Sequence, residues 1–262
     1  MFLPHNVTLG AEYGTPAWNN DRRGRITASR FGDILTAPRS KAAQEAGQLS
    51  ETARGYLLEV VASTITGQDR VGGKSAAMDR GVDKETDAID AYCLQRFLDR
   101  GTEVLEGRIL LMRDRLVGVT PDSFVEDDPE GPGLLECKCP ESKTHLETFL
   151  SGDGTPEDPR QVPEVYVPQV QGQLWVSGRR WCDFVSFDDR FPGPMQLIVI
   201  RAYRDEAYIA ELAAKVLHFE QMVLQRLERV RRFLKACTPE QARVVHNALQ
   251  ESLREHTLHA EG

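Results

Sequence analysis

The chain has 262 residues, of which 40% are hydrophobic, so it is long enough to bury a core of its own. Its formal net charge is −8, from 32 basic and 40 acidic residues, which argues against a generic nucleic-acid coat protein that binds by neutralising phosphates. No run of about 18 apolar residues occurs, and Met1 does not open a signal segment. We therefore expect an intracellular protein that makes no membrane contact.

The cysteines form neither a CxxC pair nor the Cys/His spacing of a zinc finger; they are Cys93, Cys137, Cys139, Cys182 and Cys237. This usage is typical of free thiols in a reducing compartment. It argues against a zinc or iron–sulfur site.

One stretch departs from the acidic average. The stretch from Pro16 to Lys41 has a net charge of +4, because it contains six basic residues and only two acidic ones, Asp21 and Asp33. The basic residues are Arg22, Arg23, Arg25, Arg30, Arg39 and Lys41. Charge alone leaves two interpretations open, a solvated arginine face and a phosphate-binding surface.

Periodicity and capping residues predict helices over 27–35, with Thr27 or Ser29 as the cap, over 52–65, stopped by Gly67, and over 75–98. Strands are predicted over 104–112, 116–120, 134–139, 181–187 and 197–203, with a hairpin turn at 113–114. A helix over 165–177 and a long amphipathic helix over 205–236 complete the pattern.

This order predicts an α/β (α+β) domain with a central mixed β-sheet flanked by helices. We expect one domain over 1–237. A helical C-terminal extension is predicted over 238–262, because Thr238 and Pro239 can restart a helix.

Two charged side chains stand on one side of the predicted strand 134–139. Because side chains alternate along a strand, Glu136 and Lys138 point to one face, while Leu135 and Cys137 point to the other. Asp122, at the end of the preceding strand, reaches the same place if the two strands pair. Burying an isolated carboxylate costs several kcal/mol unless it is paired or bound to a metal, so this cluster needs an explanation.

A divalent metal ion provides one. Mg²⁺ prefers oxygen ligands, and Asp122, Glu136 and the carbonyl of Cys137 would supply them. Lys138 could position or deprotonate a water and offset phosphate charge. The alternative is a surface Glu/Lys patch beside an unrelated turn aspartate. A Pro-Asp pair, thirteen further residues and then ExK in an apolar strand favours the metal site.

The motif Pro121-Asp122…Glu136-Cys137-Lys138 resembles the PD-(D/E)xK nuclease motif. Its flanks are similar to those of the phage lambda exonuclease (YqaJ-type viral recombinase) family. The matching pieces follow the family's order from Trp18 to Tyr203; they are Trp18…Arg22…Ile26–Ser29, Gly81…Glu85, Thr120–Asp122, Leu135–Pro140 and Gln169-Val170-Gln171…Leu174–Val176. The resemblance implies a restriction-endonuclease-like core.

The resemblance also assigns roles to residues. It makes Asp122 and Glu136 metal ligands and Lys138 the catalytic lysine, with Glu85 and Gln171 as further active-site residues. Without it we would interpret Glu85 as a solvated helix residue and Gln171 as a helix-to-sheet hydrogen bond. Glu59 on the preceding helix is a weaker candidate for the same site.

Substrate binding follows from the same resemblance. Arg22, Ser29 and Thr27 are expected to contact DNA, and Arg22 and Ser29 would hold a terminal 5′ phosphate with help from a helix N-terminus. The alternative for Arg22 is a general contact with the duplex backbone, like those expected of Arg23 and Arg25.

The implied function is a Mg²⁺-dependent 5′-to-3′ exonuclease acting on double-stranded DNA ends, with Mn²⁺ as a possible substitute. It would release 5′-phosphomonoesters and leave 3′ single strands. The resemblance further implies a ring-shaped homotrimer, a phage single-strand annealing protein as partner, and a location in the cytoplasm, that of the host cell if the chain is phage-encoded.

Three other functions are weighed against this one. An iron–sulfur nuclease would need four cluster cysteines, and only Cys182 and Cys237 lie beyond the core. A PD-(D/E)xK endonuclease would use the same metal chemistry but would cut a closed circular duplex. A catalytically dead DNA-end-binding module would not need Asp122, Glu136 and Lys138 intact.

Overall fold

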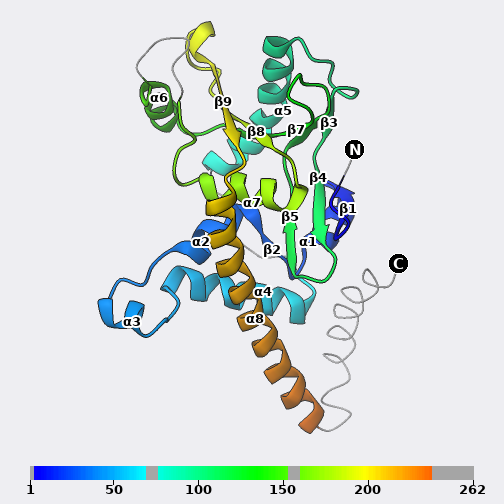
Figure 1. Ribbon diagram of the computed structural model, residues 1–262, viewed down its shortest axis with the longest axis vertical. Helices are drawn as coiled ribbons and strands as arrows, with labels where there is room; N and C mark the ends of the chain where they lie inside the picture. The colour runs from blue at the N-terminus through cyan, green and yellow to red at the C-terminus, as the bar shows by residue number, and fades with distance from the viewer. Residues whose placement is uncertain (1–2, 69–75, 153–159, 238–262) are drawn as a thin grey trace.

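The computed structural model describes residues 3–68, 76–152 and 160–237 (Figure 1). Its helices are α1 (Pro16–Arg22), α2 (Phe31–Leu35), α3 (Lys41–Glu45), α4 (Glu51–Thr66), α5 (Ala76–Arg96), α6 (Ser142–Leu150), α7 (Val167–Ser177) and α8 (Glu206–Ala236). Its strands are β1 (Val7–Glu12), β2 (Ile26–Thr27), β3 (Val104–Glu106), β4 (Arg108–Met112), β5 (Val117–Val119), β6 (Ser123–Val125), β7 (Gly133–Lys138), β8 (Trp181–Phe187) and β9 (Leu197–Tyr203). Within these ranges, none of the helices combines the length and apolarity needed to cross a bilayer.

The strands form two mixed sheets rather than the single central sheet that the sequence predicts. A four-stranded sheet has the order β1-β4-β5-β2, and a five-stranded sheet has the order β3-β6-β7-β8-β9. The predicted strand 104–112 is divided at Gly107, so that β3 lies in one sheet and β4 in the other. The α/β class is therefore confirmed, and the prediction of one sheet is wrong.

The division has a steric cause at Gly107. A Cβ atom on this residue would lie 2.2 Å from the carbonyl oxygen of Pro121 and 2.6 Å from that of Asp122, so only glycine fits. Pro121 lacks an N–H group and lies between β5 and β6, where the returning chain also passes from one sheet to the other. Asp122 therefore lies at a bend between the two sheets.

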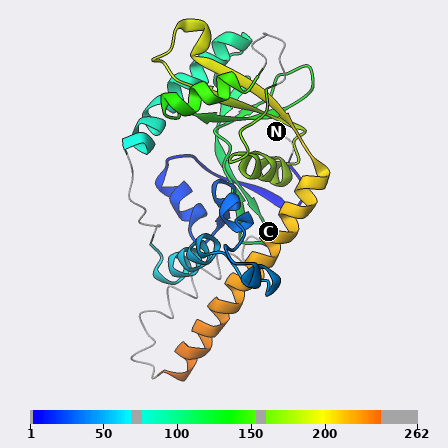
Figure 2. The same ribbon diagram turned by 90° about the vertical axis from the view of Figure 1, so that its left-hand side faces the viewer.

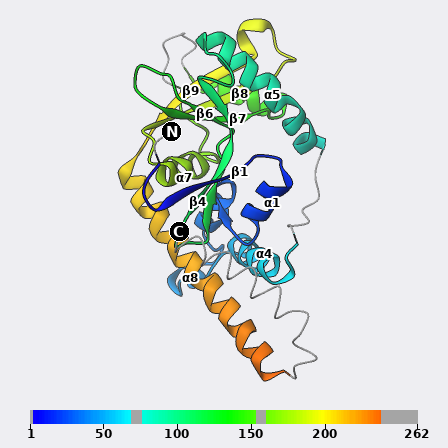
Figure 3. The same ribbon diagram turned by 90° about the vertical axis from the view of Figure 1, so that its right-hand side faces the viewer.

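The five-stranded sheet is covered on both faces. Leu135 and Cys137 of β7 pack with Ile89 and Tyr92 of α5 in one apolar cluster. The opposite face packs against α7 in the larger core, to which Leu134 of β7 contributes. Figure 3 shows α5 and α7 on opposite sides of the strands. The predicted alternation of β7 is confirmed, and it leaves Glu136 and Lys138 on the α7 side.

The four-stranded sheet and the helices below it share the larger core. That core includes Phe31 of α2, Tyr56 of α4 and Phe219 of α8, and the rings of Tyr56 and Phe219 stack at 5.4 Å between centroids. α8 runs along one side of the molecule across α7, α2 and α4 (Figure 2). The apolar stripe that the periodicity predicts is buried except at Val230, which is half-buried; its buried members are Ile209, Leu212, Val216, Phe219, Val223, Leu227 and Leu234.

Helix ends follow the capping signals in the sequence. Ser50 accepts a hydrogen bond from Ala53 N–H at the start of α4, and Gly67 ends that helix with a φ of 63°. Asp205 caps α8 through the N–H of Tyr208. The predicted helix 27–35 is wrong at its start, because a 3₁₀ turn over Ala28–Arg30 precedes α2.

Several short elements escaped prediction, namely β1, β2, β6, α1, α3 and α6. Each has between two and nine residues, which is too short for a hydrophobic periodicity to be recognised in the sequence. The predicted C-terminal extension 238–262 falls wholly outside the described residues.

Candidate active site

Glu136 and Lys138 lie on the same face of β7, because side chains alternate along a strand. Glu136 is fully buried, whereas the side chain of Lys138 near the strand end keeps 25% of its exposure. The ammonium group of Lys138 forms an ion pair with Glu136 Oε1. The two charges that the sequence places on one face therefore contact each other.

Asp122 joins this pair because β6 and β7 pair antiparallel directly beyond the bend. Its backbone N–H donates to the carbonyl of Leu135 at 3.1 Å, and its Oδ2 accepts a hydrogen bond of 2.6 Å from the N–H of Cys137. The predicted convergence of Asp122, Glu136 and Lys138 is therefore present in the structure.

Two glutamines of α7 hold Glu136 from above the sheet. Gln169 donates to Glu136 Oε1, and Gln173 donates to Oε2 at 2.6 Å and to the carbonyl of Thr120 at 3.1 Å. Gln173 is completely buried. Because a buried carboxylate is stable only when its oxygens are satisfied, these amides fix the rotamer of Glu136.

Gln171, the glutamine expected in the active site, lies elsewhere. Its Nε2 donates to the carbonyl of Tyr203 at 2.8 Å, and its Oε1 accepts from the N–H of Asp205 at 3.0 Å. This is the helix-to-sheet hydrogen bond that was its alternative interpretation. The physical reason is helical spacing: Gln169 and Gln173 are four residues apart and share a face, and Gln171 points away from it.

Glu85 of α5 lines the same cavity as Asp122, Glu136 and Lys138, as expected. Glu59 does not line it. Glu59 pairs with Arg30 at 2.9 Å on the surface, so the structure does not bring this weaker candidate to the site.

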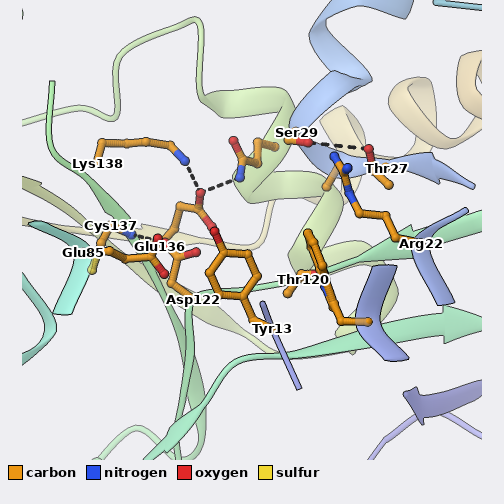
Figure 4. Close-up of a pocket in the computed structure, with 13 residues that line it drawn as sticks. Tyr13, Arg22, Thr27, Ser29, Glu85, Thr120, Asp122, Glu136, Cys137 and Lys138 are labelled. Atoms are coloured by element: carbon orange, nitrogen blue, oxygen red, sulfur yellow. Dashed lines mark hydrogen bonds and ion pairs between the residues drawn. The ribbon is translucent and has the colours of Figure 1, made fainter. Parts of the chain in front are cut away.

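The opposite wall of the cavity carries the expected substrate-binding residues. Arg22, Thr27 and Ser29 all line it, and Figure 4 shows them across the cavity from the carboxylates. The Thr27 and Ser29 hydroxyl oxygens are 3.5 Å apart. Because Ser29 belongs to the 3₁₀ turn, the expected α-helix N-terminus is not part of this wall.

The basic stretch is not one surface. Arg25 is buried and donates to the carbonyl of Arg115, and Arg30 pairs with Asp33 and Glu59. Arg22 is the member of the stretch that lines the cavity, where its guanidinium lies 5.2 Å from the ring centre of Trp18. The local net charge of +4 therefore overstated the number of arginines that line the cavity.

Trp18, Thr120 and Tyr13 connect the two walls. Trp18 donates from Nε1 to the hydroxyl of Thr120 at 3.0 Å, and its ring meets that of Tyr13 edge-on at 5.0 Å. Neither Tyr13 nor Gln173 was predicted. The spacing of Gln173 four residues after Gln169 could have revealed its shared face, but no local pattern marks Tyr13.

The electrostatics of the cluster favour a cation. Burial, followed by repulsion from Glu136, raises the pKa of Asp122 well above its ordinary value. The same two causes raise the pKa of Glu85 to about 7. Burial opposes the charge on Lys138, but Glu136 and Asp122 outweigh it and raise the pKa of the ammonium group.

The oxygen atoms of Asp122, Glu136 and the Cys137 carbonyl fit a hard divalent ion such as Mg²⁺. Cys137 lines the cavity although its thiol packs toward α5, so its backbone faces the cavity. In the described ranges, no three Asp, Glu, His or Cys side chains converge closely enough to hold an ion alone. Two carboxylates, one carbonyl and waters form the ligand set that Mg²⁺ commonly takes, and the ion would relieve the repulsion between Asp122 and Glu136.

Comparison with solved structures identifies the fold. The alkaline exonuclease LHK-Exo from Laribacter hongkongensis is 32% identical, with 83% of this chain and 97% of that chain covered and a TM-score of 0.65. LHK-Exo in complex with dAMP matches at the same identity and coverage with a TM-score of 0.66. A phage-related exonuclease from Haemophilus somnus 129PT, at 20% identity, covers 81% of this chain and 99% of its own, with a TM-score of 0.58. Two mixed sheets flanked by helices thus define the nuclease-like fold of these exonucleases.

A family model for the YqaJ-like viral recombinase domain matches residues 17–180, which span the whole carboxylate and lysine cluster. The chain belongs to the YqaJ-like viral recombinase domain family. This confirms the resemblance inferred from the motifs. Comparison with curated proteins gives no match.

Proposed function

We propose that this protein is a Mg²⁺-dependent exonuclease that hydrolyses double-stranded DNA from 5′ ends. The observation that carries the proposal is one cavity of about 250 Å³ with a buried carboxylate and lysine cluster on one wall and Arg22, Thr27 and Ser29 on the other. A phosphodiester could lie at the first wall while a terminal phosphate lies at the second. End recognition would then position the scissile bond, which is a large part of rate acceleration.

Asp122, Glu136 and the Cys137 carbonyl would hold the ion, which would supply Lewis-acid activation of a water and of the phosphate oxygens. Lys138 would place its ammonium group beside the attacking water and the developing negative charge. Gln169 and Gln173 would keep Glu136 oriented by hydrogen bonds to its oxygens. Mn²⁺ accepts the same oxygen ligands and is expected to substitute.

The polarity of digestion is proposed from the second wall. Arginine presents a rigid fork of donors that matches phosphate oxygens, and the hydroxyls of Thr27 and Ser29 add donors beside it. A terminal 5′ phosphate carries more negative charge than an internal phosphodiester, so this wall would favour it. Products would be 5′-phosphomonoesters, and the dAMP bound to the related LHK-Exo is a ligand of that class.

Assembly is proposed from family membership. A closed ring of three copies would surround duplex DNA with its active sites, and head-to-tail contacts close readily into such rings. It would also reconcile a net charge of −8 with DNA binding, because basic side chains could face the channel. A phage single-strand annealing protein is the proposed partner, and the cytoplasm is the proposed location, that of the host cell if the chain is phage-encoded.

The test is digestion of linear duplex labelled at one 5′ or one 3′ end, with Mg²⁺. The 5′ label should be released first as a mononucleotide, while a 3′ label should stay on a strand that shortens from its own 5′ end. A covalently closed circular duplex should stay intact. Cutting of the circle would favour the endonuclease function, and binding of ends without hydrolysis in Mg²⁺ or Mn²⁺ would favour a catalytically dead module.

A further inference from the structure

Tyr13 stands in the cavity between its two walls. It follows β1 directly, and its backbone N–H donates to the carbonyl of Gly107 at 2.9 Å. Gly14, with a φ of 77°, then turns the chain so that Thr15 can cap α1 through the N–H of Trp18. The backbone of Tyr13 is thus tied to the bend between the two sheets and to the start of α1.

The ring of Tyr13 packs against an aromatic partner. It meets the ring of Trp18 at 83°, an edge-to-face arrangement that is favourable for aromatic pairs. Trp18 is in turn held by its hydrogen bond to the hydroxyl of Thr120. Tyr13 is 37% exposed, and this contact with Trp18 orients its ring.

That hydroxyl is a polar group in a cavity whose lining carries both carboxylates and basic side chains. It lies within electrostatic reach of Glu85, Asp122, Lys138 and Arg22, which come from both walls. Figure 4 shows the phenol end of the ring directed toward the carboxylates. Among the residues that the structure describes, none forms a hydrogen bond with this hydroxyl.

Tyr13 lines a second cavity in addition to the active-site cavity. The active-site cavity and a second cavity of about 270 Å³ share three lining residues, which are Tyr13, Glu85 and Asp122. The second cavity is lined by Glu12 and Glu106, and its basic residue, Arg100, already pairs with Asp90 and Glu106, so this cavity is unfavourable for a phosphate. An anion that contacts Tyr13 is expected to lie on the side of Arg22 and Lys138.

We propose that Tyr13 is a substrate-contacting residue whose hydroxyl donates a hydrogen bond to a non-bridging oxygen of the phosphodiester that is cleaved. This inference rests on the proposed nuclease function. Phosphodiester oxygens only accept hydrogen bonds, so the phenol must be the donor. A hydrogen bond to a charged group contributes about 1.5–3 kcal/mol, which corresponds to a rate effect of roughly 10- to 100-fold.

The test compares Tyr13→Phe with wild type on three linear duplexes. These carry at the first linkage from the 5′ end either an ordinary phosphodiester or one of the two phosphorothioate diastereomers, in which sulfur replaces one non-bridging oxygen. Mn²⁺ is used throughout because it tolerates sulfur. Tyr13→Phe preserves the ring contact with Trp18 and removes only the hydroxyl.

We expect Tyr13→Phe to slow single-turnover cleavage by about 10-fold or more on the ordinary linkage and on one diastereomer. On the other diastereomer the variant and wild type should cleave at nearly equal rates, because sulfur already weakens that hydrogen bond. Equal rates on the ordinary linkage, or the same deficit on all three linkages, would overturn the proposal.

Tyr203→Phe is the matched control. Tyr203 is 56% exposed and donates its hydroxyl to Glu130 outside the cavity, so this variant should cleave all three substrates like wild type. If wild type cleaves none of the duplexes with either Mg²⁺ or Mn²⁺, both the proposed nuclease function and the proposed role of Tyr13 are rejected. Cleavage by wild type with no effect of Tyr13→Phe rejects only the role of Tyr13.

Discussion

The backbone N–H of Cys137 donates a hydrogen bond of 2.6 Å to Oδ2 of Asp122. One peptide unit of β7 therefore fixes the carboxylate at the bend, and the same residue lines the cavity through its backbone. Asp122 and Glu136 are held near each other at an electrostatic cost, since burial and mutual repulsion raise the pKa of Asp122. A site arranged in this way is prepared for a cation before the cation binds.

Asp122→Asn should abolish hydrolysis and yet stabilise the metal-free protein. A carboxyl group whose pKa is raised in the folded state stabilises that state below its unfolded pKa, and this stability is lost as pH rises through the folded pKa. Asparagine carries no charge, so it removes the free-energy cost of ionising a buried carboxyl group. Its side-chain oxygen can still accept the hydrogen bond from the N–H of Cys137. Thermal unfolding in EDTA at about pH 8 should give a higher Tm than wild type, and a lower Tm would contradict the assignment.

Mg²⁺ should raise the Tm of wild type, because a ligand that binds only the folded state stabilises it by mass action. The increase should be much smaller in Asp122→Asn and Glu136→Gln, which lose one charged ligand each. Ca²⁺ should also raise the Tm without supporting hydrolysis. The site assignment fails if Mg²⁺ stabilises wild type and both variants equally.

Glu85→Gln should show a pH-dependent gain in stability. The pKa of Glu85 is raised to about 7 by burial and then by Glu136, so the cost of its ionisation in the folded state develops above the unfolded pKa and is complete once pH passes 7. In EDTA the variant should therefore melt above wild type at about pH 8, and the two should converge as pH falls toward 5. A gap that widens on acidification would exclude this origin.

Gln173→Leu and Gln171→Leu form a matched pair on one helix. Gln173 bonds to Glu136, so its loss should lower kcat by about 10- to 100-fold through a misplaced carboxylate. Gln171 bonds to the backbone at Tyr203 and Asp205, so its loss should lower the Tm but leave kcat near that of wild type. Steady-state digestion and thermal melts separate the two effects; the reverse pattern would restore Gln171 to the active site.

Arg22→Ala should slow digestion of 5′-phosphorylated duplex much more than digestion of 5′-hydroxyl duplex, because the guanidinium would pair with the terminal dianion. Arg39→Ala is the control, since Arg39 belongs to the same basic stretch but is exposed and does not line the cavity. Equal losses on both substrates would mean that Arg22 contacts the duplex backbone generally.

The sequence by itself determined the elements that repeat a strong local pattern. Alternation along 134–139 was enough to put Glu136 and Lys138 on one face, because the side-chain period of a strand is two. Gly67 marked the end of α4 because a glycine C-cap uses only neighbouring backbone groups. The motif around Asp122 predicted the metal site, and the same residues do converge on one cavity.

Tertiary structure decided what depends on contacts between distant segments. Gly107 divides a predicted strand because Pro121 approaches it from fourteen residues away, and no local pattern records that approach. Which glutamine of α7 reaches Glu136 depends on the rotation of the helix over the sheet. Tyr13 enters the cavity only because β1 pairs with β4, about a hundred residues later in the chain, and local sequence carries no signal for such a pairing.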